Sequence, residues 1–194
     1  DGRILPRRGV VISMIAPYKA VMPIFPAEIF HGGAETLGYL MGAAGLGGGI
    51  AVLMLAARRN VRGLARIILA AALTAGVALT AFSQTRWLWL GYVLLFFIGA
   101  GMLVVITGTS TILQTIVEDE KRGRVMSLYT MSFLGMIPMG GLAAGALADL
   151  IGAPATLALS GACCVGAGVV FWLKLPVLRS HIRAHYLRLG IIRD

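Results

Sequence analysis

Charged residues are scarce in this chain, and acidic ones are the scarcest. Of its 194 residues, 13% are charged, with 8 Asp and Glu against 17 Lys and Arg. Apolar residues make up 58%, and the mean hydropathy is +0.88. Soluble domains average about 25% charged and about 45–50% apolar residues. The shortage of charge therefore excludes an ordinary soluble domain and indicates a polytopic membrane protein.

Cysteine and histidine are also rare. The two cysteines, Cys163 and Cys164, are adjacent within an apolar run, where a bridge between neighbours would be strained, so we expect them to be small packing residues. His181 and His185 have the i, i+4 spacing of metal ligands but no third ligand nearby. No nucleophile, acid and base occur together. We expect no metal, no cofactor and no enzymatic activity.

Six long apolar segments fill most of the chain. A helix of about 20 residues crosses the hydrocarbon core of a bilayer, so six spans with short turns fit the length. The sequence predicts an all-α membrane bundle of six helices over 10–175, between a linker end (1–9) and a basic tail (176–194). Its spans are 10–30, 37–57, 64–82, 87–112, 125–148 and 155–173. The turn 83–86 is short enough to make the third and fourth spans antiparallel neighbours.

Basic residues gather in alternate turns. One predicted side holds 15 of the 17: Arg3, Arg7, Arg8, Arg58, Arg59, Arg62, Arg66, Lys121, Arg122, Arg124, Lys174, Arg179, Arg183, Arg188 and Arg193. Cytoplasmic loops of membrane proteins carry such an excess. We therefore expect the protein to lie in the inner membrane of a bacterium, with both termini in the cytoplasm. Anionic lipid headgroups, rather than nucleic acid, are the expected counter-charge.

Small residues and prolines mark the contacts between helices. The second span contains Gly42, Gly45, Gly47, Gly48 and Gly49, which allow close backbone approach. In the fifth span, Gly141, Gly145 and Asp149 stack on one helix face, and Pro138 lies in the same helix. We expect this helix to pack closely and to bend. Glu118, Asp119 and Glu120 are expected at its positive dipole end.

Three segments carry a family resemblance: HGGAETLGYLMGAAGLGG (31–48), EDEKRGRVMSLY (118–129) and FLGMIPMGGLAAGALADLIG (133–152). They resemble the C-terminal six-helix half of a major facilitator superfamily transporter, in the drug and siderophore efflux branch called the transmembrane secretion effector group. The resemblance implies multidrug or siderophore export by alternating access, with a small amphiphilic cargo and antiport of protons. It also implies an N-terminal six-helix half. The loop 57–63 departs from the superfamily pattern, because Asn60 stands where an acidic residue is common.

Several polar residues are candidates for a substrate cavity. Lys19, beside Tyr18 in the first span, either attracts an anionic cargo, or it snorkels to the membrane interface or pairs with a carboxylate of a missing half. Thr107, Thr111 and Gln114 recur at i, i+4 and i+7, with Ser110 beside them, and either line the cavity or satisfy backbone carbonyls within their own helix. The loop arginines, which contact headgroups or facing acidic residues, are Arg58, Arg59, Arg62, Arg122 and Arg124.

Two other functions stay open at this stage. The chain begins with Asp1 rather than Met, which suggests a fragment. It could instead be a free-standing six-span protein that forms a transporter as a homodimer, and this predicts a dimer in mild detergent. It could also be a structural or regulatory remnant that binds a lipid or protein partner without transporting anything.

Overall fold

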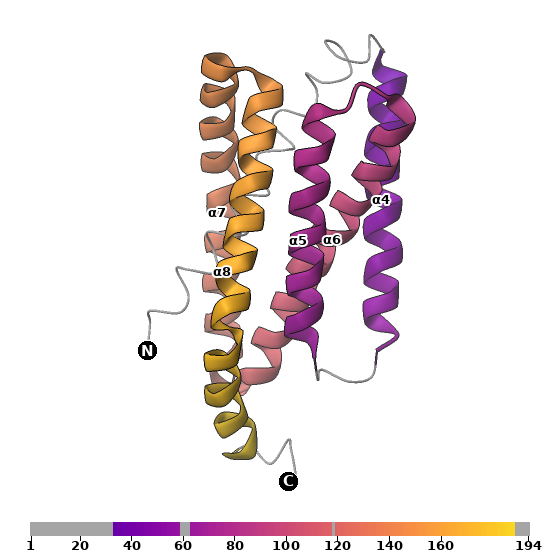
Figure 1. The fold of residues 1–194 in the computed structure, drawn as a ribbon. Helices are drawn as coiled ribbons and strands as arrows, with labels where there is room; N and C mark the ends of the chain where they lie inside the picture. The colour runs from indigo at the N-terminus through magenta and orange to yellow at the C-terminus, as the bar shows by residue number, and fades with distance from the viewer. Residues whose placement is uncertain (1–32, 59–62, 118, 189–194) are drawn as a thin grey trace.

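The computed structural model describes residues 33–58, 63–117 and 119–188, and these residues form helices joined by short turns (Figure 1). The helices, labelled as in Figure 1, are α4 (Ala34–Ala56), α5 (Leu64–Gln84), α6 (Leu88–Ile116), α7 (Asp119–Ile151) and α8 (Ala153–Arg188). All five are long and apolar enough to cross a membrane. A helix suits that setting because it satisfies its backbone hydrogen bonds internally. The all-α prediction is thus confirmed for the described residues, and five candidate membrane helices correspond to five of the predicted spans. The predicted first span (10–30) lies outside the described residues.

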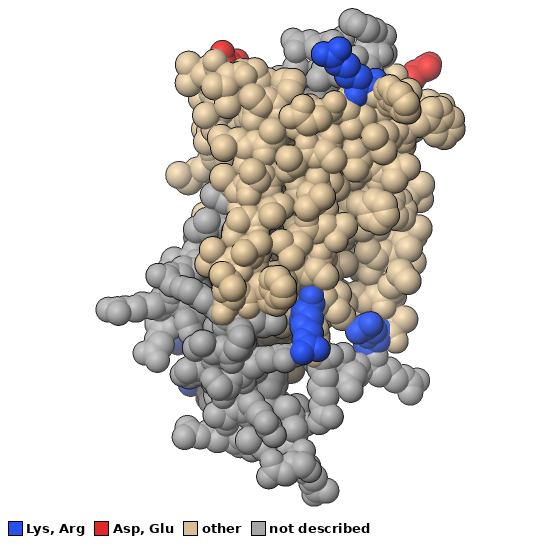
Figure 2. All heavy atoms as spheres, in the orientation of Figure 1, with Lys and Arg blue, Asp and Glu red and all other residues tan. Residues whose placement is uncertain are grey.

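The helices alternate in direction. The α4–α5 and α6–α7 corners lie at one end of the bundle, and the α5–α6 and α7–α8 corners lie at the other (Figure 1). We call the first end the basic end, because it carries Arg58, Arg66, Lys121, Arg122 and Arg124 among the described residues. Between the two ends, the face shown in Figure 2 has no Lys, Arg, Asp or Glu among its described atoms. An uncharged band between charged ends is the pattern that a bilayer imposes.

Two helix boundaries differ most from the predicted ones, and the others agree within about four residues. α7 begins at Asp119 rather than at 125, so most of the charged turn belongs to the helix, and Asp119 and Glu120 occupy its first turn. Carboxylates there are stabilised by the positive end of the helix dipole, which confirms the expectation for these two residues. α8 does not end at 173 but continues to Arg188, so much of the predicted tail extends the last helix. The apolar span within it does end at Leu173.

Two of the corners contain a glycine in the left-handed conformation. Gly63 precedes α5 with φ of 83°, and Gly152 joins α7 to α8 with φ of 84°. Residues with a side chain rarely adopt this left-handed conformation. The Gly152 N–H donates to the Ala148 carbonyl at the end of α7, and the Gly152 carbonyl accepts from the Thr156 N–H at the start of α8. One residue thereby reverses the chain.

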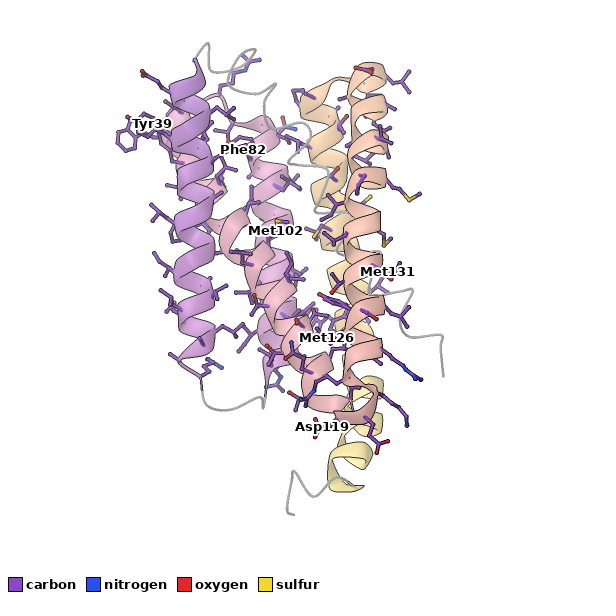
Figure 3. All side chains as sticks on the ribbon, turned by 180° about the vertical axis from the view of Figure 1, so that it is seen from behind. Tyr39, Phe82, Met102, Asp119, Met126 and Met131 are labelled. Carbon is purple, nitrogen blue, oxygen red and sulfur yellow. The ribbon has the colours of Figure 1, made fainter. Side chains whose placement is uncertain are left out.

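The helices pack in the order α4, α6, α5, α8, α7. The predicted contact between the third and fourth spans is therefore confirmed as the α5–α6 pair. A buried cluster at the end opposite the basic one joins all five helices, and it includes Leu40, Phe82, Leu95, Ala144 and Leu157. Figure 3 shows Phe82 among the helices and Tyr39 pointing away from them.

Glycines set the distance between α4 and α6. A Cβ at Gly47 would collide with the Phe96 carbonyl oxygen, and a Cβ at Gly99 would collide with the Ala44 carbonyl oxygen. Gly48 lies against the side chain of Leu103. Close approach was expected of the whole glycine run, but a Cβ would meet nothing within 4 Å at the other three positions: Gly42, Gly45 and Gly49. Only one face of α4 meets α6, so close approach at these three positions stays a prediction that the described residues do not test.

Glycines also allow α5 to pack closely against α6 on one side and against α8 on the other. A Cβ at Gly101 of α6 would lie 2.7 Å from the Ala75 Cβ, and a Cβ at Gly161 of α8 would lie 2.9 Å from the Gly76 carbonyl oxygen. Contacts between backbones replace the hydrophobic effect, which does not drive helices together in lipid. α5 is thus the centre of the packed part of the molecule.

Candidate functional site

Among the described residues, the contacts of α6 with α4 and α5 leave one face of α6 uncovered. In the half away from the basic end this face is apolar, with Val93 51% and Phe97 45% exposed. Thr107 and Thr111 follow Val93 and Phe97 by 14 residues, which is about four helical turns, so they lie on the same face. Gln114, one turn further, is exposed. The uncovered face is therefore apolar in one half and polar in the half nearer the basic end.

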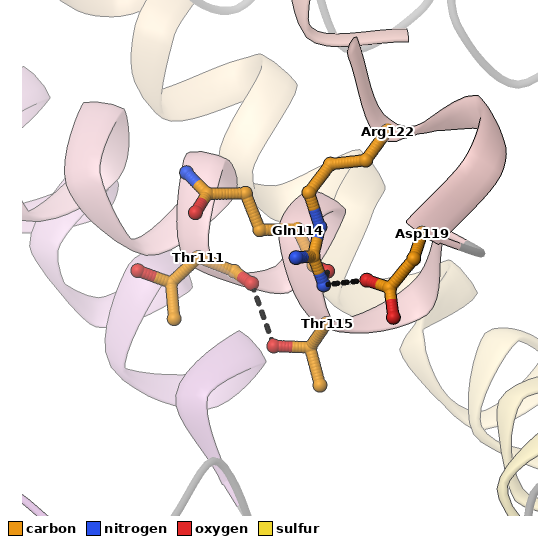
Figure 4. Close-up of polar contacts among 5 residues, drawn as sticks. All are labelled: Thr111, Gln114, Thr115, Asp119 and Arg122. Atoms are coloured by element: carbon orange, nitrogen blue, oxygen red, sulfur yellow. Dashed lines mark hydrogen bonds and ion pairs between the residues drawn. The ribbon is translucent and has the colours of Figure 1, made fainter.

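The polar half, which we call the α6 stripe, consists of Thr107, Ser110, Thr111, Gln114 and Thr115. The Thr111 hydroxyl donates to the Thr107 carbonyl at 2.9 Å, and the Thr115 hydroxyl donates to the Thr111 carbonyl at 2.8 Å (Figure 4). The Gln114 side-chain amide donates to the Ser110 hydroxyl oxygen at 3.0 Å.

These bonds are the ones expected if the polar groups satisfy their own helix. They leave the oxygen lone pairs of Thr111 and Thr115 able to accept a hydrogen bond from a ligand. The cavity-lining role of the stripe stays a prediction. Thr115 was not among the predicted cavity residues, although it continues the four-residue spacing from Thr107 and Thr111.

One loop arginine connects two helices. The Arg122 Nη2 lies 2.9 Å from the Asp119 Oδ1 and donates to the Gln114 carbonyl oxygen at 3.2 Å (Figure 4). Sequence spacing gave no sign of the second contact, which spans eight residues and the α6–α7 corner. The other described loop arginines, Arg58 and Arg124, are exposed, and the remaining two, Arg59 and Arg62, lie outside the described residues.

α7 carries the predicted packing and bending residues. Pro138 is exposed within the continuous helix, Gly141 is half-buried, and Asp149 is exposed near the end opposite the basic one. A Cβ at Gly145 would meet nothing within 4 Å in the described part of the chain. The predicted role of this face in close packing therefore stays a prediction, and a contact there must come from outside the described residues.

The predicted cavity residues Tyr18 and Lys19 lie outside the described residues. Cys163 and Cys164 are free thiols, and the buried Cys164 lies with its Sγ 3.6 Å from the Ala72 carbonyl oxygen, in keeping with a packing role. Among the residues that the structure describes, no group of His, Cys, Asp and Glu could hold a metal ion. The side chains of His181 and His185 are not among those described.

Comparison with known proteins agrees with this architecture. The model of the transmembrane secretion effector family matches residues 4–187. The chain is also 27% identical, over 169 residues, to the staphyloferrin A transporter of Staphylococcus aureus (strain NCTC 8325 / PS 47). That match covers 84% of this chain but 42% of the relative, so the chain spans less than half the length of this curated relative. No solved structure matches.

The family match extends over nearly the whole chain, and five described helices have the length and composition of membrane spans. Both findings indicate an integral membrane protein of a transporter family, as the sequence resemblance implied. The chain therefore belongs to the transmembrane secretion effector family of the major facilitator superfamily.

Proposed function

We propose that this chain is the C-terminal half of a secondary-active exporter, which moves a small amphiphilic molecule such as a drug or a siderophore by alternating access. The observation that carries the proposal is the uncovered face of α6. Its apolar half, with Val93 and Phe97, suits the hydrophobic part of an amphiphile. Its polar half, with Thr107 and Thr111, offers acceptor oxygens to the polar part. A helix facing only lipid has no need of such a polar half.

The second half of the cavity would come from another six-helix unit. α7 has large exposed side chains around Gly145, including Met139 at 72% and Leu142 at 77% exposed. The chain spans less than half of its curated relative, so an N-terminal half is the partner that we favour over a second copy. Membrane lipids would cover the remaining outward faces.

Protons are the proposed coupling ion, as is expected for the family. The described carboxylates are all exposed and lie near helix ends: Glu35, Asp119, Glu120 and Asp149. None of them has the buried position of a proton carrier within a span. We therefore place proton binding in the partner half. We place the basic end on the cytoplasmic side of a bacterial inner membrane, so both termini of the chain would lie in the cytoplasm.

The proposal can be tested with inside-out membrane vesicles from bacteria that produce this chain together with the proposed N-terminal half. The probes are ethidium and radiolabelled staphyloferrin A, the latter chosen because the curated relative is named for it. We expect energy-dependent accumulation of at least one probe. No accumulation of either probe above that of vesicles without the protein would contradict transport and favour a remnant that only binds a partner.

A matched pair of variants tests the site itself. Thr111→Val removes a hydroxyl from the α6 stripe, and Thr74→Val removes one from the exposed side of α5, where it makes the same bond to a carbonyl four residues earlier. One hydrogen bond to the cargo is worth about 1 kcal/mol, so we expect roughly fivefold weaker apparent affinity for Thr111→Val alone. Equal effects of the two substitutions would remove Thr111 from the cavity.

A further inference from the structure

The corner between α6 and α7 is short and carries little packing. α6 ends at Ile116 and α7 begins at Asp119, so only positions 117 and 118 separate them. Although consecutive in sequence, the two helices touch at few positions among the described residues, whereas α6 packs extensively on α4 and α5. Side-chain packing therefore does little to fix the angle between α6 and α7.

Arg122 makes a polar connection across this corner. The last carbonyls of a helix have no partner within the helix, and they carry the negative end of its dipole. The guanidinium of Arg122 donates to one of them, the Gln114 carbonyl, from the first turn of α7. Asp119, one turn earlier in α7, holds the same nitrogen at 2.9 Å. Bonds that involve a charged donor are stronger than neutral ones.

We infer that Arg122 is a clasp, a positioning residue that ties the polar end of α6 to the start of α7. Its acceptor is the backbone of Gln114, which lies in the same turn as the end of the α6 stripe. Moving α7 relative to α6 would require the clasp to open. The α6 stripe therefore moves together with α7 while the clasp is closed. The geometry of the clasp stands by itself, and only its importance for transport rests on the proposed function.

The neighbouring arginine offers a matched control. Arg124 belongs to the same turn of α7 and has the same charge, but residues two positions apart on a helix point in different directions. The Arg124 carbonyl accepts from the Ser127 hydroxyl, and the Arg124 side chain makes no hydrogen bond or ion pair within the described part of the chain. A general effect of basic charge near the membrane surface would be shared by Arg122 and Arg124, whereas the clasp belongs to Arg122.

The experiment measures the distance between α6 and α7 by double electron–electron resonance in detergent. Spin labels are placed at Gln114→Cys, which keeps the backbone acceptor, and at Leu128→Cys, which is exposed. The two native cysteines are replaced by alanine. We expect Arg122→Gln to displace the distance distribution to longer values and to broaden it, while Arg124→Gln leaves it unchanged. Arg122→Lys, which keeps the charge but not the planar fork, should give a smaller displacement.

A second variant separates the two contacts of the clasp. Asp119→Asn should broaden the distribution less than Arg122→Gln, and the double substitution should match Arg122→Gln alone. Size-exclusion profiles verify that each variant stays folded, as expected for exposed side chains. An unchanged distribution in Arg122→Gln, or equal changes in Arg122→Gln and Arg124→Gln, would overturn the clasp. If Arg122→Gln displaces the α6–α7 distance but the unsubstituted protein transports neither ethidium nor staphyloferrin A, the proposed function is contradicted and the clasp stands.

Discussion

The contact between α4 and α6 gives the most direct test of the fold, through alanine substitutions at two glycines of one helix. Gly47 lies on the face of α4 that meets α6, and a Cβ there would lie 2.8 Å from the Phe96 carbonyl carbon and 3.0 Å from its Cα. Gly45, two residues earlier, has no described atom within 4 Å of an added Cβ. Gly47→Ala must therefore push the two helices apart, while Gly45→Ala adds a methyl group in open space.

The magnitude follows from what the two substitutions share. Both exchange glycine for alanine inside the same helix, so the gain in helix propensity, about 1 kcal/mol, cancels when they are compared. The collision remains, and its partner is backbone that cannot rotate away as a side chain can. Overpacking of this kind costs about 1–3 kcal/mol. We expect the free energy of unfolding of Gly47→Ala to lie below that of Gly45→Ala by this amount.

Thermal unfolding of the purified protein in one detergent, followed by circular dichroism, measures the difference. For a chain of this length each kcal/mol shifts the melting temperature by about 2–4 °C, so Gly47→Ala should melt about 2–12 °C below Gly45→Ala. Both variants must first be shown to enter the membrane fraction equally. If Gly47→Ala melts with Gly45→Ala or above it, the α4–α6 contact described here is wrong.

Three further predictions concern a corner, the outward face of α7 and the orientation in the membrane. Gly152→Ala forces a side chain into the left-handed conformation, and calorimetry should show a loss of about 1–2 kcal/mol of stability; an unchanged melting temperature would count against the φ of 84°. Gly145→Leu should leave stability unchanged, because an added Cβ meets nothing within 4 Å, yet abolish flux by blocking the partner half; full flux would contradict that contact. Cysteines replacing Arg58 and Arg124 should react with a membrane-impermeant maleimide from one side of the bilayer, and one replacing Arg86 from the other. Labelling of Arg58→Cys and Arg124→Cys from opposite sides would refute the topology.

The helices could be predicted from the sequence because the hydrocarbon core of a bilayer offers no hydrogen-bond partners to the backbone. A run of about 20 apolar residues can cross the bilayer only by satisfying its own backbone, and helices do so one at a time. The five described helices accordingly match the predicted spans. The boundary errors fall in charged segments, at the start of α7 and the end of α8, where hydropathy marks the edge of the membrane but not the end of the helix.

The candidate site was predictable only in part. The spacing of Thr107, Thr111 and Gln114 identified one polar face of α6, because residues in an i, i+4, i+7 pattern share a face in any helix. Whether a neighbouring helix covers that face of α6 depends on which glycines of α4, α5 and α6 pack against which backbone, and residue spacing does not show this. The bond from Arg122 to the Gln114 carbonyl joins two helices, and no periodicity within either helix could indicate it.

The sequence by itself determined that this protein lies in a membrane, where its helices run and which corners carry the basic charge, because each of these depends on the partition of residues between water and lipid. Only the tertiary structure decided which glycines lie at contacts between helices. Gly47 touches α6 and Gly45 does not, although their local sequences are nearly alike. The reason is that a helix presents a different residue to each neighbour, and the identity of the neighbour is a property of the bundle.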